Sequence, residues 1–151
     1  MTVYTVTKFV HILLAIMAVG FNASYAIWIA RASRAREHLL YSLRGIKFMD
    51  DYLANPGYGL LFVSGLVMVF VGKLSLTTFW LAAALVLWVT LGVIAFFLYT
   101  PTLRAQIRLL EAGGGGSQEF ATLSRRGTVV GGVLAAIVVV IVFLMVTKPS
   151  F

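Results

Sequence analysis

The sequence lacks most of what a soluble enzyme needs. None of its 151 residues is cysteine, so this chain alone cannot build a disulfide, a zinc–thiolate site or an iron–sulfur cluster. Charged residues make up only 11% of the chain, whereas 61% are hydrophobic and the mean hydropathy is +1.00. Such a composition excludes an ordinary water-soluble domain. We therefore predict one membrane domain over residues 1–151.

The hydrophobic residues fall into four blocks, each long enough to cross a bilayer as a helix. About 20 residues suffice, because a helix rises ~1.5 Å per residue and the hydrocarbon layer is about 30 Å thick. We predict an all-α integral membrane protein, a bundle of four transmembrane helices. Its spans cover, in order, residues 9–30, 56–74, 78–100 and 128–147.

The residues that flank these blocks predict where the helices begin and end. Asn55 and Pro56 suit the first turn of the second span, and Pro101 is expected to stop the third. A cleaved signal peptide is the alternative for the first span. Arg31, Arg34 and Arg36 follow that span directly and favour an anchor that is not cleaved.

The positive charges lie mainly on one side of the predicted bundle. The net charge is +7, and nine of the twelve Lys and Arg residues fall in the segments 31–55 and 101–127. These nine are Arg31, Arg34, Arg36, Arg44, Lys47, Arg104, Arg108, Arg125 and Arg126. The positive-inside rule predicts that both segments are cytoplasmic loops and that both termini lie outside, in a bacterial-type plasma membrane. We thus attribute the charge to orientation and expect no nucleic-acid partner.

The two basic loops contain further local signals. The first loop carries Leu39, Leu40, Leu43, Ile46 and Phe48 among its charges, which predicts a short amphipathic helix on the membrane surface. The adjacent pair Asp50-Asp51 is expected to form a solvated helix cap. All five acidic residues fall in these loops, which argues against an ion-coupled pump. The run Gly113–Ser117 resembles a laboratory linker; we take it as native and flexible.

His11 is the only histidine within a predicted span, and it lies on a helix face with other polar residues. The face continues through Ala15, Ala18, Asn22 and Tyr25 at intervals of four and three residues, and is expected to point into the bundle. Polar side chains inside a membrane are costly unless they are paired, so His11, Asn22 and Tyr25 are candidate binding residues. A purely structural role, as hydrogen-bonding partners between helices, is the alternative.

Small residues predict close helix packing. On the fourth span Gly127, Gly131 and Ala135 recur at intervals of four residues with Gly132 beside them, and Gly65 has the same role on the second span. Thioether ligands for copper or haem could come only from methionines, of which Met17 and Met68 are weak candidates. The sequence contains no H-E-x-x-H motif and no phosphate-binding loop, and we expect no catalytic residues.

Short motifs resemble a known group of bacterial membrane proteins. The segment 8–12, Lys-Phe-Val-His-Ile, followed by Tyr25 and Arg31, is similar to the first helix of relatives of the haem-binding J-type protoporphyrinogen oxidases. The ending at residues 146–151 resembles their C-terminal Lys-Pro-Phe. The chain also resembles, more distantly, the copper-resistance D-type membrane proteins. Over nearly its whole length the chain resembles an uncharacterised bacterial family of predicted four-helix integral membrane proteins with a Met-Val-x-Lys-Pro ending.

The oxidase resemblance implies a b-type haem whose iron is held by the first-helix histidine, here His11. If haem binds there, Tyr4 and Tyr25 are expected to tune it without being ligands. The resemblance also implies a catalytic lysine on a later helix, but residues 74–101 contain neither Lys nor His. We therefore favour a non-enzymatic membrane protein that works as a homo-oligomer or as an accessory subunit of a larger membrane complex. Haem binding for electron transfer or haem handling is the alternative. A multimeric transporter or channel for a small solute or metal, lined by Asn22, Ser64 and Thr90, is the third hypothesis.

Overall fold

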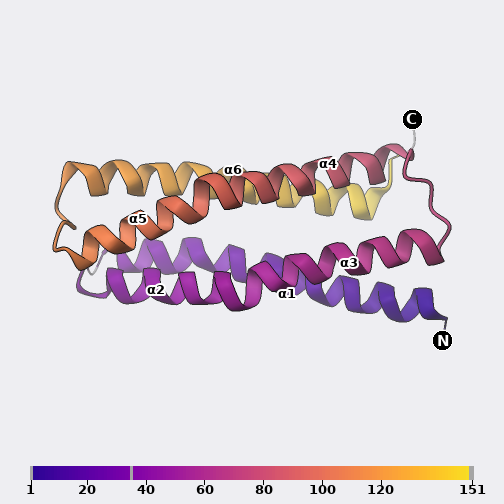
Figure 1. The fold of residues 1–151 in the computed structure, drawn as a ribbon, viewed down its shortest axis with the longest axis horizontal. Coiled ribbons are helices and arrows are strands. Elements are labelled where there is room, and N and C mark those ends of the chain that lie inside the picture. Colours follow the sequence, from indigo (N-terminus) through magenta and orange to yellow (C-terminus); the bar gives the residue numbers. More distant parts are fainter. Residues whose placement is uncertain (1, 35, 150–151) are drawn as a thin grey trace.

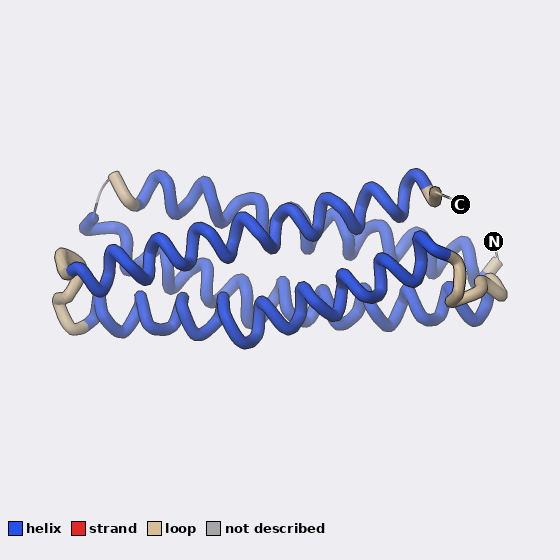
Figure 2. The backbone as a smooth tube through the Cα atoms, turned by 90° about the horizontal axis from the view of Figure 1, so that it is seen from above, coloured by secondary structure: helices blue, strands red, loops and turns tan. Residues whose placement is uncertain are grey.

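Four long helices lie side by side along one axis (Figures 1 and 2). The structure, a computed structural model, describes residues 2–34 and 36–149, without the side chain of Arg36. Within these residues it contains no strand, and the prediction of an all-α protein with four membrane-spanning helices is confirmed. Ser150 and Phe151 of the C-terminal motif lie outside the described residues. We call the end of the bundle that carries both chain termini the termini end (Figure 1).

The first long helix is α1 (Val3–Ala32), and a short 3₁₀ turn (Arg36–His38) leads to the second. The second is continuous through α2 (Leu39–Met49), a π-helical turn η2 (Asp50–Ala54) and α3 (Asn55–Val71). The third runs through α4 (Phe79–Ile94), a π-helical turn η3 (Ala95–Tyr99) and α5 (Thr100–Glu111). The fourth is α6 (Gln118–Thr147).

Each long helix is longer than the span predicted for it, although the second ends at Val71 and not at Leu74. The four helices contain 30 or 33 residues, which at ~1.5 Å per residue corresponds to about 45–50 Å, against about 30 Å of hydrocarbon. Much of the segments 31–55 and 101–127 is therefore helical and prolongs the bundle beyond the apolar layer. We call this prolonged part, opposite to the termini, the α2–α5 end (Figure 1).

Pro101 does not stop the third helix, contrary to the sequence-based expectation. The N–H of Thr100 donates to the carbonyl of Ala95, five residues earlier, so the turn before the proline is wider than an α-helical turn. The same arrangement precedes Pro56, where the N–H of Asn55 donates to the carbonyl of Asp50. A wider turn gives the proline ring room beside the preceding carbonyls, and the helix continues through both prolines.

The glycine run forms a tight turn between α5 and α6. Gly113 has φ +77°, a conformation that favours glycine. The N–H of Gly114 donates to the carbonyl of Leu109 at 2.8 Å, and that of Gly113 donates to the carbonyl of Leu110 at 3.1 Å, a Schellman motif that ends α5. Ser117 then caps α6 by accepting a hydrogen bond from the N–H of Phe120 at 3.1 Å. The segment expected to be a flexible linker thus has a defined geometry.

The predicted amphipathic helix exists as α2, but its apolar face does not lie on the membrane surface. Leu43 and Ile46 are 1% and 0% exposed, and they pack with Tyr25 and Leu103 in the main hydrophobic core. The sequence-based expectation was wrong because a neighbouring helix, α5, covers this face. The core therefore lies at the α2–α5 end.

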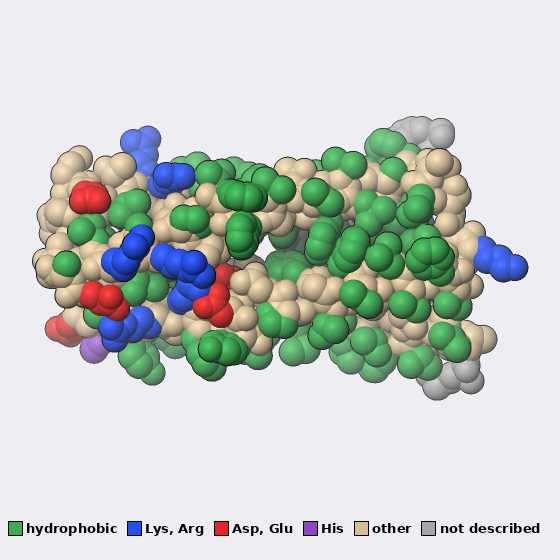
Figure 3. All heavy atoms as spheres, viewed as in Figure 1, with side chains coloured by type: hydrophobic (Ala, Val, Ile, Leu, Met, Phe, Trp, Pro, Cys, Tyr) green, Lys and Arg blue, Asp and Glu red, His purple; other side chains and the backbone are tan. Residues whose placement is uncertain are grey.

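The helices form two pairs, α1 with α3 and α4 with α6. Although α3 and α4 follow each other in the chain, their described backbones make no close approach. The pairs are joined through α2 and α5, and nearer the termini end the ring of Phe62 stacks on that of Trp88 with centroids 4.5 Å apart. Figure 3 shows a hollow between the two pairs near the middle of the molecule.

Candidate functional site

Polar side chains of α1 line its contact with α3. Nδ1 of His11 lies 2.9 Å from the hydroxyl oxygen of Ser64, and Nδ2 of Asn22 donates to the hydroxyl of Tyr58 at 2.9 Å. One turn further along, Tyr25 is 3% exposed. We call these five residues the polar seam. The α1 face that was expected to point into the bundle does so, with Ala18 and Tyr25 buried and His11 and Asn22 half-buried.

The hydrogen bonds around His11 favour one tautomer of its ring. The hydroxyl of Ser64 donates to the carbonyl of Leu61 at 3.0 Å, so its proton is not available to the ring. In the tautomer that keeps the Ser64–Leu61 hydrogen bond, Nδ1 of His11 donates to Ser64 and Nε2 carries the lone pair. A histidine whose Nδ1–H is held by a protein oxygen is oriented as metal-binding histidines usually are. The orientation of its ring would allow His11 to bind a metal ion through Nε2.

The predicted packing glycines have different neighbours. A Cβ atom at Gly65 would lie 3.2 Å from Cε1 of His11, so the absence of a side chain lets the ring sit against α3. On α6, a Cβ atom at Gly127 would lie 2.8 Å from Nε2 of Gln106, and one at Gly131 would lie 3.7 Å from the Tyr99 ring. A Cβ atom at Gly132 would meet nothing within 4 Å. The face of α6 that contains Gly127 and Gly131 therefore packs inside the bundle, whereas the face that contains Gly132 is uncovered.

Asp50 is buried, and its prediction as a solvated helix cap was wrong. Its side chain is 7% exposed, Nδ2 of Asn55 lies 3.5 Å from its Oδ2, and it is close enough to Tyr25, Tyr58 and Tyr99 to interact electrostatically with their hydroxyls. A sequence signal existed, because Asp50 continues the buried helix face of Leu39, Leu43 and Ile46 at intervals of four and three residues. Asp50 was nevertheless assigned to solvent, because aspartate is rarely buried.

Tyr25 and Trp88 each contain a buried polar atom without a partner among the described residues. These atoms are the hydroxyl oxygen of Tyr25 and Nε1 of Trp88. An unsatisfied polar group in a low-dielectric interior costs free energy. Tyr25 also interacts electrostatically with the Asp50 carboxylate. This interaction connects the polar seam with Asp50.

The described residues form no cluster of three or more His, Cys, Asp or Glu side chains suited to a metal ion. Met17 is 53% exposed on α1 and therefore points away from the bundle, whereas Met68 is half-buried one turn after Ser64 on α3. Thr90 is exposed on α4 and donates to the carbonyl of Val86 at 2.8 Å. It therefore does not line a common path with Asn22 and Ser64, so the transporter hypothesis gains no support from the geometry.

Comparison with known proteins identifies a family but no solved or curated counterpart. The family model described as "Predicted integral membrane protein (DUF2269)" matches residues 5–149, nearly the whole chain. No curated protein and no solved structure gives a match.

Proposed function

We propose that this chain, which belongs to the DUF2269 family of predicted integral membrane proteins, is a non-enzymatic membrane subunit that assembles with copies of itself. The observation that carries the proposal is that α6 has two faces of small residues, of which only one is covered within the bundle. One face is filled by Gln106 and Tyr99, whereas Gly132, Ala135 and Ala136 are exposed. Gly132 and Ala136 are four residues apart, the spacing at which small residues let a second transmembrane helix approach closely.

The polar seam supports the non-enzymatic part of this proposal. In a membrane, polar side chains that remain unpaired are candidates for chemistry, whereas paired ones hold helices together. His11 pairs with Ser64 and Asn22 pairs with Tyr58, so both contacts bind α1 to α3. Two of the three candidate binding residues, His11 and Asn22, thus take part in helix packing.

Assembly can be tested by energy transfer between donor- and acceptor-labelled copies in lipid vesicles. Leucine at Gly132 and Ala136 fills the exposed face of α6 while leaving the buried face untouched, so we expect the double variant to lose most of the energy transfer. The control places leucine at Ala23 and Ala26, which are exposed on α1. Equal transfer in all three proteins would contradict a homo-oligomer through α6 and favour a different partner subunit.

We also propose the orientation with both termini outside a bacterial-type plasma membrane. On the face drawn in Figure 3 the Lys and Arg side chains gather at the α2–α5 end, with one at the termini end. Basic residues near the ends of membrane helices remain on the cytoplasmic side. The α2–α5 end would accordingly be cytoplasmic.

Haem binding is a second candidate, and the contact of Nδ1 of His11 with Ser64, which leaves Nε2 as the possible ligand, is the observation that favours it. His11 would hold the haem iron, with Met68 or a second protomer supplying the other ligand. Bound haem would supply electron transfer. The described residues contribute the ligand and the hydrogen bond that orients it.

An absorption spectrum of the purified protein tests this candidate. Binding through His11 predicts a b-type spectrum in the wild-type protein, with about one haem per one or two chains. His11→Ala is expected to abolish this spectrum. His38→Ala is the control, because His38 is exposed beside Glu37 at the α2–α5 end. A colourless wild-type protein, purified after expression with added haem, would leave His11 as a packing residue.

A further inference from the structure

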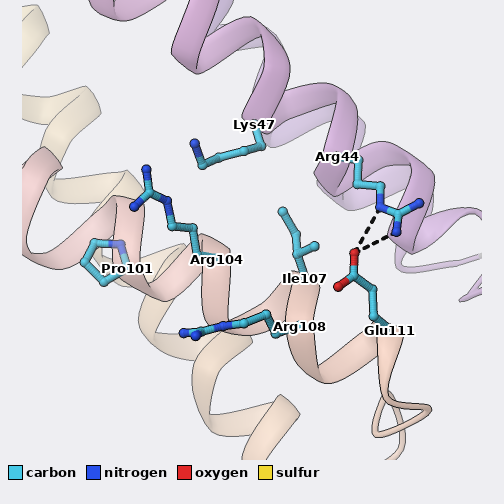
Figure 4. A pocket seen from close by; sticks show the side chains of 7 residues that line it. All are labelled: Arg44, Lys47, Pro101, Arg104, Ile107, Arg108 and Glu111. Atoms are coloured by element: carbon cyan, nitrogen blue, oxygen red, sulfur yellow. Dashed lines mark hydrogen bonds and ion pairs between the residues drawn. The ribbon is translucent and has the colours of Figure 1, made fainter.

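A basic groove lies between α2 and α5. It has a volume of about 550 Å³, and it is lined by Arg44, Lys47, Pro101, Arg104, Ile107, Arg108 and Glu111. Figure 4 shows Lys47 on α2 reaching toward Arg104 on α5, with Arg44 and Glu111 joined at one end of the groove. We call this site the α2–α5 groove.

The acidic residues near the groove neutralise only half of its positive charges. Arg44 donates to Glu111 at 2.6 Å through Nη2, and Lys47 pairs with Asp51 one turn away on its own helix. Arg104 and Arg108 are exposed and have no acidic partner among the described residues. Two like charges four residues apart on a helix repel each other. An anion between their guanidinium groups would relieve that repulsion.

The depth of the groove in the membrane indicates the kind of anion. Lys47 is 24 residues from Val71, and Arg104 is 25 residues from Phe79, so both lie about 35–40 Å from the termini end of their helices. The hydrocarbon layer is about 30 Å thick, and the headgroups extend it to about 40–45 Å. With the termini ends of these helices placed at the edge of the hydrocarbon layer, the groove lies at the level of the lipid phosphates in the leaflet around the α2–α5 end.

The groove also opens toward lipid. Figure 3 shows that Lys and Arg side chains gather on the lateral surface of the α2–α5 end. One turn from Pro101 toward the termini end, Phe97 is 65% exposed, so an apolar surface continues from the groove into the hydrocarbon layer. A molecule with a charged head and an apolar chain fits both surfaces.

We propose that the α2–α5 groove binds the phosphate group of an anionic phospholipid, with Arg104 and Arg108 as its main ligands. A guanidinium presents two parallel N–H donors to a phosphate, which gives direction as well as charge. Basic pockets between membrane helices at this level are a recurrent way of binding anionic headgroups. The site is separate from the polar seam, and it does not depend on haem or on assembly through α6.

The test is a lipid titration of the detergent-purified full-length protein followed by native mass spectrometry. Phosphatidylglycerol, phosphatidylcholine and inorganic phosphate are the three probes. We expect phosphatidylglycerol to bind at least tenfold more tightly than phosphatidylcholine, and the double variant R104Q/R108Q to lose about tenfold in phosphatidylglycerol affinity. The matched control R31Q/R126Q also removes two positive charges from the same half of the molecule, outside the groove, and is expected to retain the preference.

Three results would overturn the proposal. A wild-type protein that binds both lipids equally has no headgroup site. A control that loses as much affinity as R104Q/R108Q shows a general effect of charge. Inorganic phosphate that binds as tightly as phosphatidylglycerol shows a site for a free anion. The first and third results need no variant, so the proposal can fail even if a substituted chain does not fold.

Discussion

Replacing Leu43 or Ile46 by alanine is expected to lower the free energy of unfolding by about 2–5 kcal/mol. Both side chains are almost completely buried, at 1% and 0% exposure, in the core that joins α2 to α1 and α5. Alanine leaves a cavity there, and the surrounding helices cannot close it without disturbing their other contacts. Because the two helix pairs are joined mainly at this end, the loss should also loosen the bundle as a whole.

Denaturant unfolding in detergent, followed by circular dichroism, measures this change. Tyr41→Ala is the matched control, because Tyr41 lies on the same helix and is 81% exposed. Its replacement should change the unfolding free energy by no more than about 0.5 kcal/mol. Equal effects at Tyr41, Leu43 and Ile46 would instead describe a helix that lies on the membrane surface, the arrangement that the sequence pattern alone suggests.

Two substitutions at Tyr25 are expected to have opposite signs. Tyr25→Ala removes a ring that is 3% exposed and should cost about 3–5 kcal/mol of unfolding free energy. Tyr25→Phe keeps the ring and removes only the hydroxyl, which is buried without a partner among the described residues. Removing an unsatisfied buried polar group should therefore raise stability, by about 1 kcal/mol.

The same unfolding experiment on Tyr58→Phe provides the comparison. The Tyr58 hydroxyl accepts a hydrogen bond from Asn22 at 2.9 Å, so its removal should lower stability by about 1 kcal/mol. A loss of stability in Tyr25→Phe would mean that the Tyr25 hydroxyl is engaged, with the nearby Asp50 carboxylate as its first candidate partner. The polar seam would then extend into the α2–α5 end.

Much of the candidate site could be predicted from helical spacing alone. Intervals of four and three residues predicted that His11, Asn22 and Tyr25 share one helix face, and in the structure that face points into the bundle. Their partners on α3 could not be predicted, because the register between two helices depends on how their side chains interlock. Ser64 was named as a lining residue of a channel, and the structure places its hydroxyl 2.9 Å from Nδ1 of His11.

Two predictions from the sequence, for Pro101 and for Asp50, were wrong for physical reasons. Pro101 was expected to end a helix because its ring disfavours helix at the preceding residue, but one wide turn is enough for the chain to continue. Asp50 was expected in water because an isolated carboxylate is costly to bury, but the positive charge of Lys47 and the side-chain amide of Asn55 favour its charged form. In both cases neighbouring groups offset a local preference.

The sequence by itself determined that the chain is a four-helix membrane protein, because a hydropathy this high leaves the backbone no other way to satisfy its hydrogen bonds in lipid. Only the tertiary structure decided which helices pair, which small face of α6 stays open, and that Arg104 and Arg108 share a groove with α2. Composition and periodicity act within one helix at a time. Pairing depends on the fit between side chains that lie far apart in the chain.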